Sequence, residues 1–519
     1  MSAEGPLEAK EIQSRAARGA LWSSISVTIS LPLAIVVSVV TARSLGPHEY
    51  ARFAYLTFVV PLVFTASDLG VSASTVRFVS RAFGAGDVAA TRDILSKSVG
   101  WNYVRFPLAF GGLIALAQPS AGVAMVTAVA VFMLLAFGGL SFSFQAENRG
   151  ATVARGGLLQ GLFVSSATIV AATTLESGTE VWAVSLSASA IVLPTWLIVV
   201  NPTLRRASLT PKLPRGLPAG FWRFALSAVL LTLLSTLVFS RSEVVILNAL
   251  GKQQALAVFA LAFGLSQRLT TPVDTLLGPL IPALSALAAA HPDRLGPGLA
   301  RAVRLSAVGV AFLAAAAVIS TMLAAPILFG PEYQGTGAAF AALAGISLIQ
   351  SATQPYIAVA HAMGRLSTLL RANLVALVVD LALAFALIPL IGLWGAVVAN
   401  VVGGGTAIVL TVVFTPAPPM SLQLPTVRLA LGAIASAALA YGAGSAVTHV
   451  NAVAGVLVAA AVGAATFLAI GNRGGLLPES DGAVLLDALP GPVARGIRPA
   501  LQLLTRPDHA PTSRRVAAP

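Results

Sequence analysis

Three ionisable residues lie inside long apolar stretches of this sequence, where they are well placed to do chemistry. Arg105 follows Trp101 and Tyr103, and Arg268 and Asp380 lie near the middles of two later stretches. An ionisable group in hydrocarbon is costly, so it faces a hydrated cavity or a partner. Arginine can bind phosphate oxygens through two parallel hydrogen bonds, and a carboxylate can take up a proton or a sodium ion. The pattern indicates a wide hydrated cavity that suits an anionic substrate.

Three acidic residues extend this set of buried charges. Asp68 lies in the second apolar stretch, and Glu243 lies near the end of the seventh. Asp274 comes six residues after Arg268 in the eighth. Carboxyl groups at such depths are candidates for binding a coupling cation.

Each charge also has a simpler structural interpretation. The apolar stem of Arg105 can carry its charged end to the membrane surface. Glu243 can form an interfacial pair with Arg241. Arg268 and Asp380 are too central to reach the surface easily, so for them the alternative to a polar cavity is a buried structural ion pair.

The elements that position these residues are apolar stretches of about twenty residues. Crossing ~30 Å of hydrocarbon at 1.5 Å per residue takes roughly twenty residues in a helix. The sequence therefore predicts an all-α polytopic membrane protein with about fourteen transmembrane helices. Their expected limits are 20–42, 52–75, 98–117, 121–144, 152–174, 180–200, 222–247, 255–278, 303–327, 336–360, 368–390, 393–414, 427–447 and 452–471.

The connectors between these stretches predict the orientation of the chain. Arginine and lysine gather in the connectors 77–97, 201–221, 289–302 and 361–367, all of which lie on the side of the N-terminus. The opposite side has fewer basic residues and carries Glu49, Glu176, Glu180 and Glu332. Basic connectors stay in the cytoplasm. Because the number of stretches is even, both termini are expected there.

Composition excludes several classes of protein. Hydrophobic residues make up 57% of the chain and charged residues only 10%, against about 25% charged residues in soluble domains. The chain has no cysteine and five scattered histidines, so we expect no disulfide, no metal site and no cofactor. The net charge of +13 is explained by the basic connectors, and we expect no nucleic-acid partner.

An internal repeat predicts how the helices are grouped. Leu45-Gly46 followed by Ala51-Arg52-Phe53-Ala54 resembles Leu250-Gly251 followed by Ala257-Val258-Phe259-Ala260, about 205 residues later. Phe329-Gly330-Pro331-Glu332-Tyr333 echoes the first copy. These glycines and prolines can be turn chemistry alone. The spacing nevertheless favours two pseudo-symmetric six-helix lobes with a working site between them.

The expected organisation follows from the repeat and the connectors. It comprises a cytoplasmic N-terminal segment at 1–19, lobes at 20–205 and 222–414, two further helices at 427–471, and a largely disordered cytoplasmic tail at 472–519 with a short amphipathic stretch around 482–489.

Several motifs resemble a known family. Residues 41–54 (TARSLGPHEYARFA) are similar to the junction of spans one and two in bacterial polysaccharide flippases, which export O-antigen and capsule repeat units. Asp68-Leu69-Gly70 and residues 77–80 continue that pattern. Residues 328–333 and 386–400 resemble two later junctions of the family. The resemblance covers roughly 15–415 and points to the multidrug/oligosaccharidyl-lipid/polysaccharide exporter superfamily.

The resemblance implies a transporter rather than an enzyme, located in the bacterial plasma membrane. Its substrate would be a polyprenyl-pyrophosphate-linked oligosaccharide, moved by alternating access for assembly of cell-surface polysaccharide, including lipopolysaccharide. Membrane lipids, glycan polymerases and glycosyltransferases are the partners it suggests. Exporters of peptidoglycan precursors or of drugs belong to the same superfamily, and a membrane enzyme of glycan assembly is the alternative from another class.

The resemblance also suggests roles for the charged residues. Members that carry pyrophosphate substrates have several cations deep in the first lobe, whereas span one here has none beyond Arg18 and Arg43 at its ends. The candidate substrate-binding residues are Arg268, Arg105, Arg77 and Arg18, and the candidate ion-coupling residues are Asp380, Asp274, Asp68 and Glu243.

Overall fold

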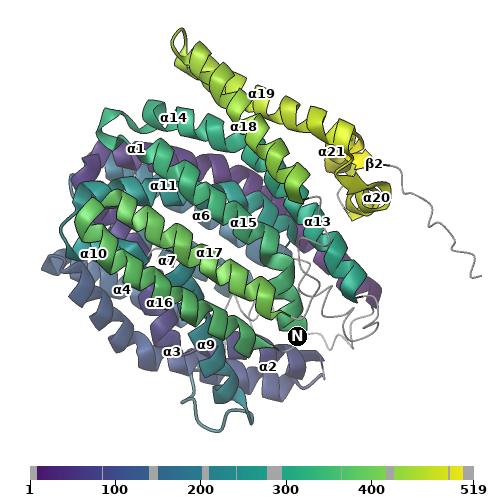
Figure 1. Ribbon diagram of the computed structural model, residues 1–519. Coiled ribbons are helices and arrows are strands. Elements are labelled where there is room, and N and C mark those ends of the chain that lie inside the picture. Colours follow the sequence, from purple (N-terminus) through teal and green to yellow (C-terminus); the bar gives the residue numbers. More distant parts are fainter. Residues whose placement is uncertain are drawn as a thin grey trace, which may run out of the picture. The chain divides into compact units, whose positions relative to one another are not determined.

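The protein is almost entirely helical. A computed structural model describes residues 9–84, 86–138, 150–200, 210–240, 242–277, 295–363, 365–415, 426–488 and 491–506 (Figure 1). Within these ranges the only strands are β1 (Leu477–Pro478) and β2 (Thr505–Arg506), which pair in parallel. Ten helical segments of the described chain are long and apolar enough to cross a bilayer. The prediction of an all-α polytopic membrane protein is confirmed.

Each of the fourteen predicted stretches coincides, over its described residues, with one helix or with consecutive helices. Helices satisfy their own backbone hydrogen bonds, which is what allows apolar segments to cross lipid. The helices are α1 (Ala9–Asp68), α2 (Val71–Gly84), α3 (Val88–Ala117), α4 (Ala121–Gly138), α6 (Gly150–Thr174), α7 (Gly178–Val200), α9 (Phe221–Ser240), α10 (Ser242–Ala249), α11 (Gln253–Leu277), α13 (Leu295–Leu313), the π-helix η2 (Ala314–Val318), α14 (Ile319–Phe329), the 3₁₀ turn η3 (Pro331–Tyr333), α15 (Thr336–Ala362), α16 (Leu366–Ile391), α17 (Leu393–Phe414), α18 (Thr426–Thr448), α19 (Ala452–Gly474), α20 (Glu479–Ala488) and α21 (Gly491–Leu504).

The Gly-Pro turns predicted by the repeat have nearly the same backbone conformation. Gly46, with φ 67° and ψ 173°, divides α1 into two helices. Gly330, with φ 90° and ψ 175°, precedes η3. The two turns also pack together, because the rings of Tyr50 and Tyr333 lie 6.1 Å apart at 88°. The Tyr333 hydroxyl donates to the carbonyl of Ala42 at 2.7 Å.

The chain divides into two compact units. The first comprises residues 1–265, 328–339 and 370–407, and the second comprises residues 266–327, 340–369 and 408–519. Each unit is described by itself below. The division into consecutive six-helix lobes at 20–205 and 222–414 stays a prediction.

In the second unit, α18 and α19 pack through small residues repeated every four positions. Gly432, Ser436, Ala440 and Gly444 are buried on α18, and Gly455, Ala459, Gly463 and Gly471 are buried on α19. Small residues let helix backbones approach closely in a membrane. A Cβ atom on Gly463 would lie 2.0 Å from the carbonyl oxygen of Ala315, so the helix pair also packs directly against η2.

After α19 the structure describes helices and strands within residues 475–488 and 491–506, where the sequence predicted a largely disordered tail. Here β1, α20, α21 and β2 form a small folded element that we call the C-terminal cap, residues 475–506 (Figure 1). Helix α20 covers residues 482–488 of the short amphipathic stretch expected around 482–489. Residues 507–519 lie outside the described part of the chain, as do residues 1–8 of the predicted N-terminal segment.

Candidate functional site

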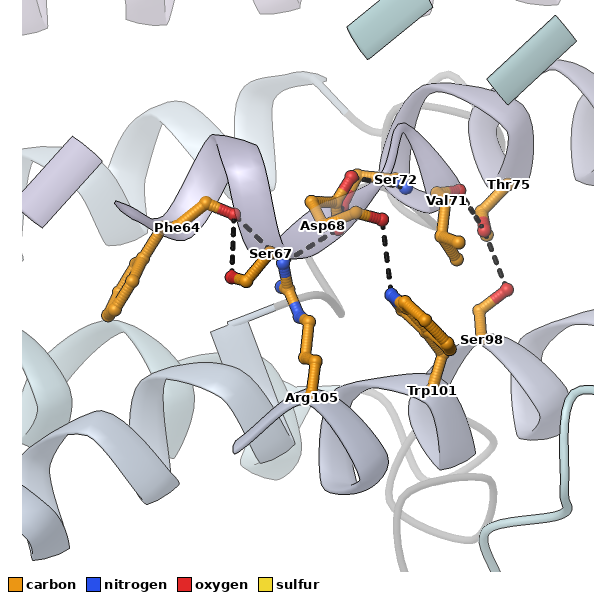
Figure 2. Close-up of polar contacts among 9 residues, drawn as sticks. All are labelled: Phe64, Ser67, Asp68, Val71, Ser72, Thr75, Ser98, Trp101 and Arg105. Atoms are coloured by element: carbon orange, nitrogen blue, oxygen red, sulfur yellow. Dashed lines mark hydrogen bonds and ion pairs between the residues drawn. The ribbon is translucent and has the colours of Figure 1, made fainter. Parts of the chain in front are cut away.

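Asp68 and Arg105 form an ion pair within the first unit (Figure 2). The Arg105 Nη1 atom lies 2.9 Å from Asp68 Oδ1, and the two side chains are only 8% and 12% exposed. The same guanidinium nitrogen donates to the carbonyl of Phe64 at 3.1 Å. The guanidinium is thus held by protein groups of α1 and α3. Arg105 is therefore a buried, paired cation.

The backbone break after α1 explains why Asp68 lies where it does. Helix α1 ends at Asp68, and Leu69 and Gly70 have φ values of 48° and 76°. A Cβ atom on Gly70 would lie 1.9 Å from the carbonyl oxygen of Ala225, so only glycine fits this turn. The turn leaves Asp68 at the start of α2, where its carboxylate accepts from the backbone N–H of Ser72 at 2.9 Å.

Neighbouring polar groups hold this carboxylate in place. The Ser72 hydroxyl donates to Asp68 Oδ1 at 2.7 Å, and the Trp101 indole N–H donates to the backbone carbonyl of Asp68 at 3.1 Å (Figure 2). One turn after Trp101 along α3, Arg105 completes the arrangement. Its Nε atom is buried without a hydrogen-bond partner in the described structure. Because of that unused donor, the guanidinium can bind a further acceptor.

A second buried site in the same unit contains two carboxyl groups. Glu243 on α10 and Asp380 on α16 are both fully buried, and they interact electrostatically. The Ser242 hydroxyl donates to Asp380 Oδ2 at 2.6 Å. Both Glu243 carboxyl oxygens, Asp380 Oδ1 and the side-chain nitrogen of Asn400 on α17 are buried and make no hydrogen bond within the described residues. We call these four residues the carboxyl cluster: Ser242, Glu243, Asp380 and Asn400.

Close helix packing produces this cluster. A Cβ atom on Gly403 would lie 2.6 Å from Asp380 Cβ, so the missing side chain lets α17 approach α16. Asn400 lies one turn earlier on α17, and Glu243 lies in the first turn of α10. The alternative pairing of Glu243 with Arg241 involves a residue outside the described part of the chain. Unpaired polar atoms in such a place can accommodate a small polar guest, such as a proton or a monovalent cation.

The remaining predicted residues lie in other places. In the second unit, Asp274 Oδ1 accepts from the Ser351 hydroxyl on α15 at 2.8 Å, and Arg268 is half-buried one and a half turns earlier on α11. In the first unit, the Arg77 guanidinium lies 4.4 Å from the centre of the Phe224 ring. Arg18 belongs to α1, but its side chain lies outside the described part.

The structure thus brings together candidate residues that the sequence had singled out separately, Asp68 with Arg105 and Glu243 with Asp380. Sequence reasoning missed the polar partners Ser242, Asn400, Ser351 and Ser72. The signal that could have found them is a polar residue inside a strongly apolar stretch. In lipid, such a residue forms a hydrogen bond with a neighbouring helix. Serine and asparagine are common enough in such stretches that their positions alone did not single them out.

The fold is similar to those of several membrane transporters of known structure. The flippase for lipid II, MurJ, in its inward closed conformation has 10% sequence identity and a TM-score of 0.62, covering 87% of this chain and 98% of MurJ. The eukaryotic MATE transporter AtDTX14 has 16% identity and a TM-score of 0.56, covering 79% and 97%. An inward-facing multidrug resistance MATE family transporter has 16% identity and a TM-score of 0.55, covering 79% and 98%.

At these identities the likeness establishes a shared fold. No protein-family sequence model matches the chain, and no curated protein sequence matches it significantly.

Proposed function

We propose that this chain is an alternating-access transporter that moves polyprenyl-pyrophosphate-linked oligosaccharide across the bacterial plasma membrane for assembly of cell-surface polysaccharide. The observation that carries the proposal is the carboxyl cluster, buried inside a fold shared over 87% of the chain with a lipid flippase. Both termini are placed in the cytoplasm by the basic connectors. The lipopolysaccharide pathway is the expected setting.

The cluster supports a cation-coupled mechanism. Two ionised carboxylates buried side by side repel each other strongly, so at least one must hold a proton or share a bound cation. Glu243 and Asp380 lie on different helices, α10 and α16. A change in their charge therefore changes how strongly these helices attract each other. Binding and release of a cation would thus favour one conformation of the transporter and then the other.

The arginines support an anionic substrate. Arg105 has an unused buried Nε donor, and it is held by Asp68 and by the Phe64 carbonyl. A pyrophosphate group would compete with Asp68 for this guanidinium, while Asp68 kept its two hydrogen bonds from Ser72. In the proposal, Arg268 supplies the second deep cation, and Arg77 and Arg18 attract the substrate at the cytoplasmic mouth. Asp68 and Asp274 are further candidates for coupling.

Two related substrates are alternatives. The likeness to MurJ favours a peptidoglycan precursor, since MurJ is named as a lipid II flippase. The likeness to MATE transporters favours drug export. We place the oligosaccharide first because of the junction motifs in residues 41–54 and 386–400.

Transport by purified protein in proteoliposomes tests the proposal. The three substrates to compare are a polyprenyl-pyrophosphate oligosaccharide, lipid II and a cationic drug, each with an imposed proton or sodium gradient. We expect oligosaccharide flipping that responds to one gradient and leaves the mass of the lipid unchanged. Conversion of the lipid to a new mass would indicate an enzyme. Preferential movement of lipid II or of the drug would replace the proposed substrate.

Variants of the carboxyl cluster test the coupling. Asp380→Asn and Glu243→Gln keep the size of each side chain and remove its ability to ionise. We expect Asp380→Asn to bind substrate without turnover. Asp93→Asn, which removes a partly exposed carboxyl near the start of α3, is the matched control and should transport normally. Wild-type transport by Asp380→Asn, still responding to the gradient, would remove Asp380 from the mechanism.

A further inference from the structure

Within the second unit, a buried carboxylate of the C-terminal cap pairs with two partly exposed arginines. Asp481 on α20 is 1% exposed, and its two oxygens accept from Arg301 Nε at 2.8 Å and from Arg304 Nε at 2.7 Å. Both arginines belong to α13. A buried carboxylate between two guanidinium groups fixes α20 against the beginning of this helix, because separating them would leave a charge unpaired in an apolar surrounding.

The apolar side of the cap is also buried within the protein. Leu476, Leu477, Leu501 and Leu504 pack in one core with Phe467 of α19. A Cβ atom on Gly471 would lie 2.3 Å from Leu504 Cδ2, so α21 lies directly against the end of α19. These four leucines are therefore used in packing within the protein.

The outer side of α21 is cationic. Arg495, Arg498 and Gln502 are exposed and lie at positions i, i+3 and i+7, which share one face of a helix. Ala494, Leu501 and Leu504 lie on the buried side. Helix α21 is therefore amphipathic because its leucines pack against the protein and its arginines face outward.

Two more exposed arginines lie at the start of α18 and at the end of α19, from which the chain enters the cap. Arg428 in the first turn of α18 donates from Nη1 to the carbonyl of Gly474 at 3.3 Å. Arg473 lies in the last turn of α19, two residues after the glycine that contacts Leu504. We call these four residues the arginine face: Arg428, Arg473, Arg495 and Arg498.

We propose that the arginine face binds the headgroups of anionic phospholipids. Helices α18 and α19 are long and apolar enough to cross the bilayer, and Arg428 and Arg473 lie in the terminal turns that meet the same membrane surface. Figure 1 shows α20, α21 and β2 beside that end of α19. Guanidinium groups match phosphodiester oxygens. Arginines beside a transmembrane helix are attracted to anionic lipid. Asp481 is already neutralised by Arg301 and Arg304, so it does not offset this charge.

The test uses the purified full-length chain in detergent and native mass spectrometry. The protein is titrated with dimyristoyl-phosphatidylglycerol and, separately, with dimyristoyl-phosphatidylcholine. We expect tighter binding of phosphatidylglycerol to the wild type. Each arginine removed should weaken it about 5-fold, so Arg495→Gln with Arg498→Gln should weaken it about 25-fold. Phosphatidylcholine binding should not change.

Arg81→Gln with Arg92→Gln is the matched control, because it removes two exposed arginines from α2 and α3, outside the cap. It should keep the preference for phosphatidylglycerol. Equal loss in this control would show that net charge, rather than the arginine face, selects the lipid. Equal binding of the two lipids by the wild type would also overturn the proposal. Displacement of phosphatidylglycerol by millimolar inorganic phosphate would identify an ion site instead.

Stability measurements keep this result interpretable. Without lipid, the double variant should unfold at the wild-type temperature if Arg495 and Arg498 make no contact that holds the cap; the contacts of Asp481 are untouched. If it does not, the single Arg473→Gln variant on α19 gives the answer, with an expected loss of about 5-fold. Unchanged affinity in Arg473→Gln would then contradict the proposal.

Discussion

Removing one partner of the Asp68–Arg105 pair should destabilise the protein more than removing both. Asp68→Ala leaves a guanidinium that is 8% exposed, with the Phe64 carbonyl at 3.1 Å as its remaining partner in the described contacts. It also removes the acceptor for both hydrogen bonds from Ser72. Arg105→Met leaves a buried carboxylate that keeps those two bonds. The double variant leaves no buried charge at this site.

The expected loss of stability follows from the burial of the Asp68–Arg105 pair. Breaking a buried ion pair from one side costs about 3–5 kcal/mol, whereas replacing both partners with apolar residues is nearly neutral. For a chain of 519 residues, an unfolding entropy of ~2.1 cal/mol/K per residue gives about 1.1 kcal/mol/K. Asp68→Ala should therefore lower the unfolding temperature by about 3–5 °C. Arg105→Met should have a smaller effect, and Asp68→Ala with Arg105→Met the smallest.

Thermal unfolding of the four proteins in one detergent, followed by intrinsic tryptophan fluorescence, measures this order. Asp68→Asn, which keeps an acceptor for Ser72 but removes the charge, should fall between the wild type and Asp68→Ala. A double variant at least as unstable as Asp68→Ala would refute the reasoning, because the loss would then come from packing rather than from an uncompensated charge. An Asp68→Ala protein as stable as the wild type would show that the pair contributes nothing.

Three further predictions concern the substrate cation, a pH-sensitive contact and the topology. Arg268→Ala should abolish export in the proteoliposome assay while the abundance of the protein in the membrane stays nearly unchanged. Arg268→Lys should keep part of the export activity, because the charge survives. Normal export by the alanine variant would make Arg268 structural or dispensable. Lys212 and Lys97 hold the pKa of Asp93 below its ordinary value, so this contact is complete at neutral pH and is lost as the pH falls through the lowered pKa. Proteolysis of the connector at 210–220 should therefore increase only below about pH 4. The Lys212→Gln variant should be cleaved at pH 7 as fast as the wild type is cleaved at acidic pH. A C-terminal reporter that is active only outside the cytoplasm should be silent, and strong activity would reverse the orientation.

The pattern of apolar stretches was enough to predict the helices. A span must be about twenty residues long because the bilayer sets its thickness, so the limits can be read locally. The turns at Gly46 and Gly330 were likewise predictable, because glycine before proline at the end of a span favours a positive φ. The positions of Asp380 and Arg268 along their helices also followed directly from the sequence.

The partners of those residues were decided only by tertiary structure. Ser242 and Asp380 are 138 residues apart in the chain, and they meet because α10 and α16 lie side by side in the folded protein. Asp481 lies in a tail rich in glycine, proline and arginine, and it pairs with Arg301, which is 180 residues away in the sequence. No local sequence pattern predicts this contact. Apolar length is a property of one helix, whereas an ion pair is a property of the packing between two.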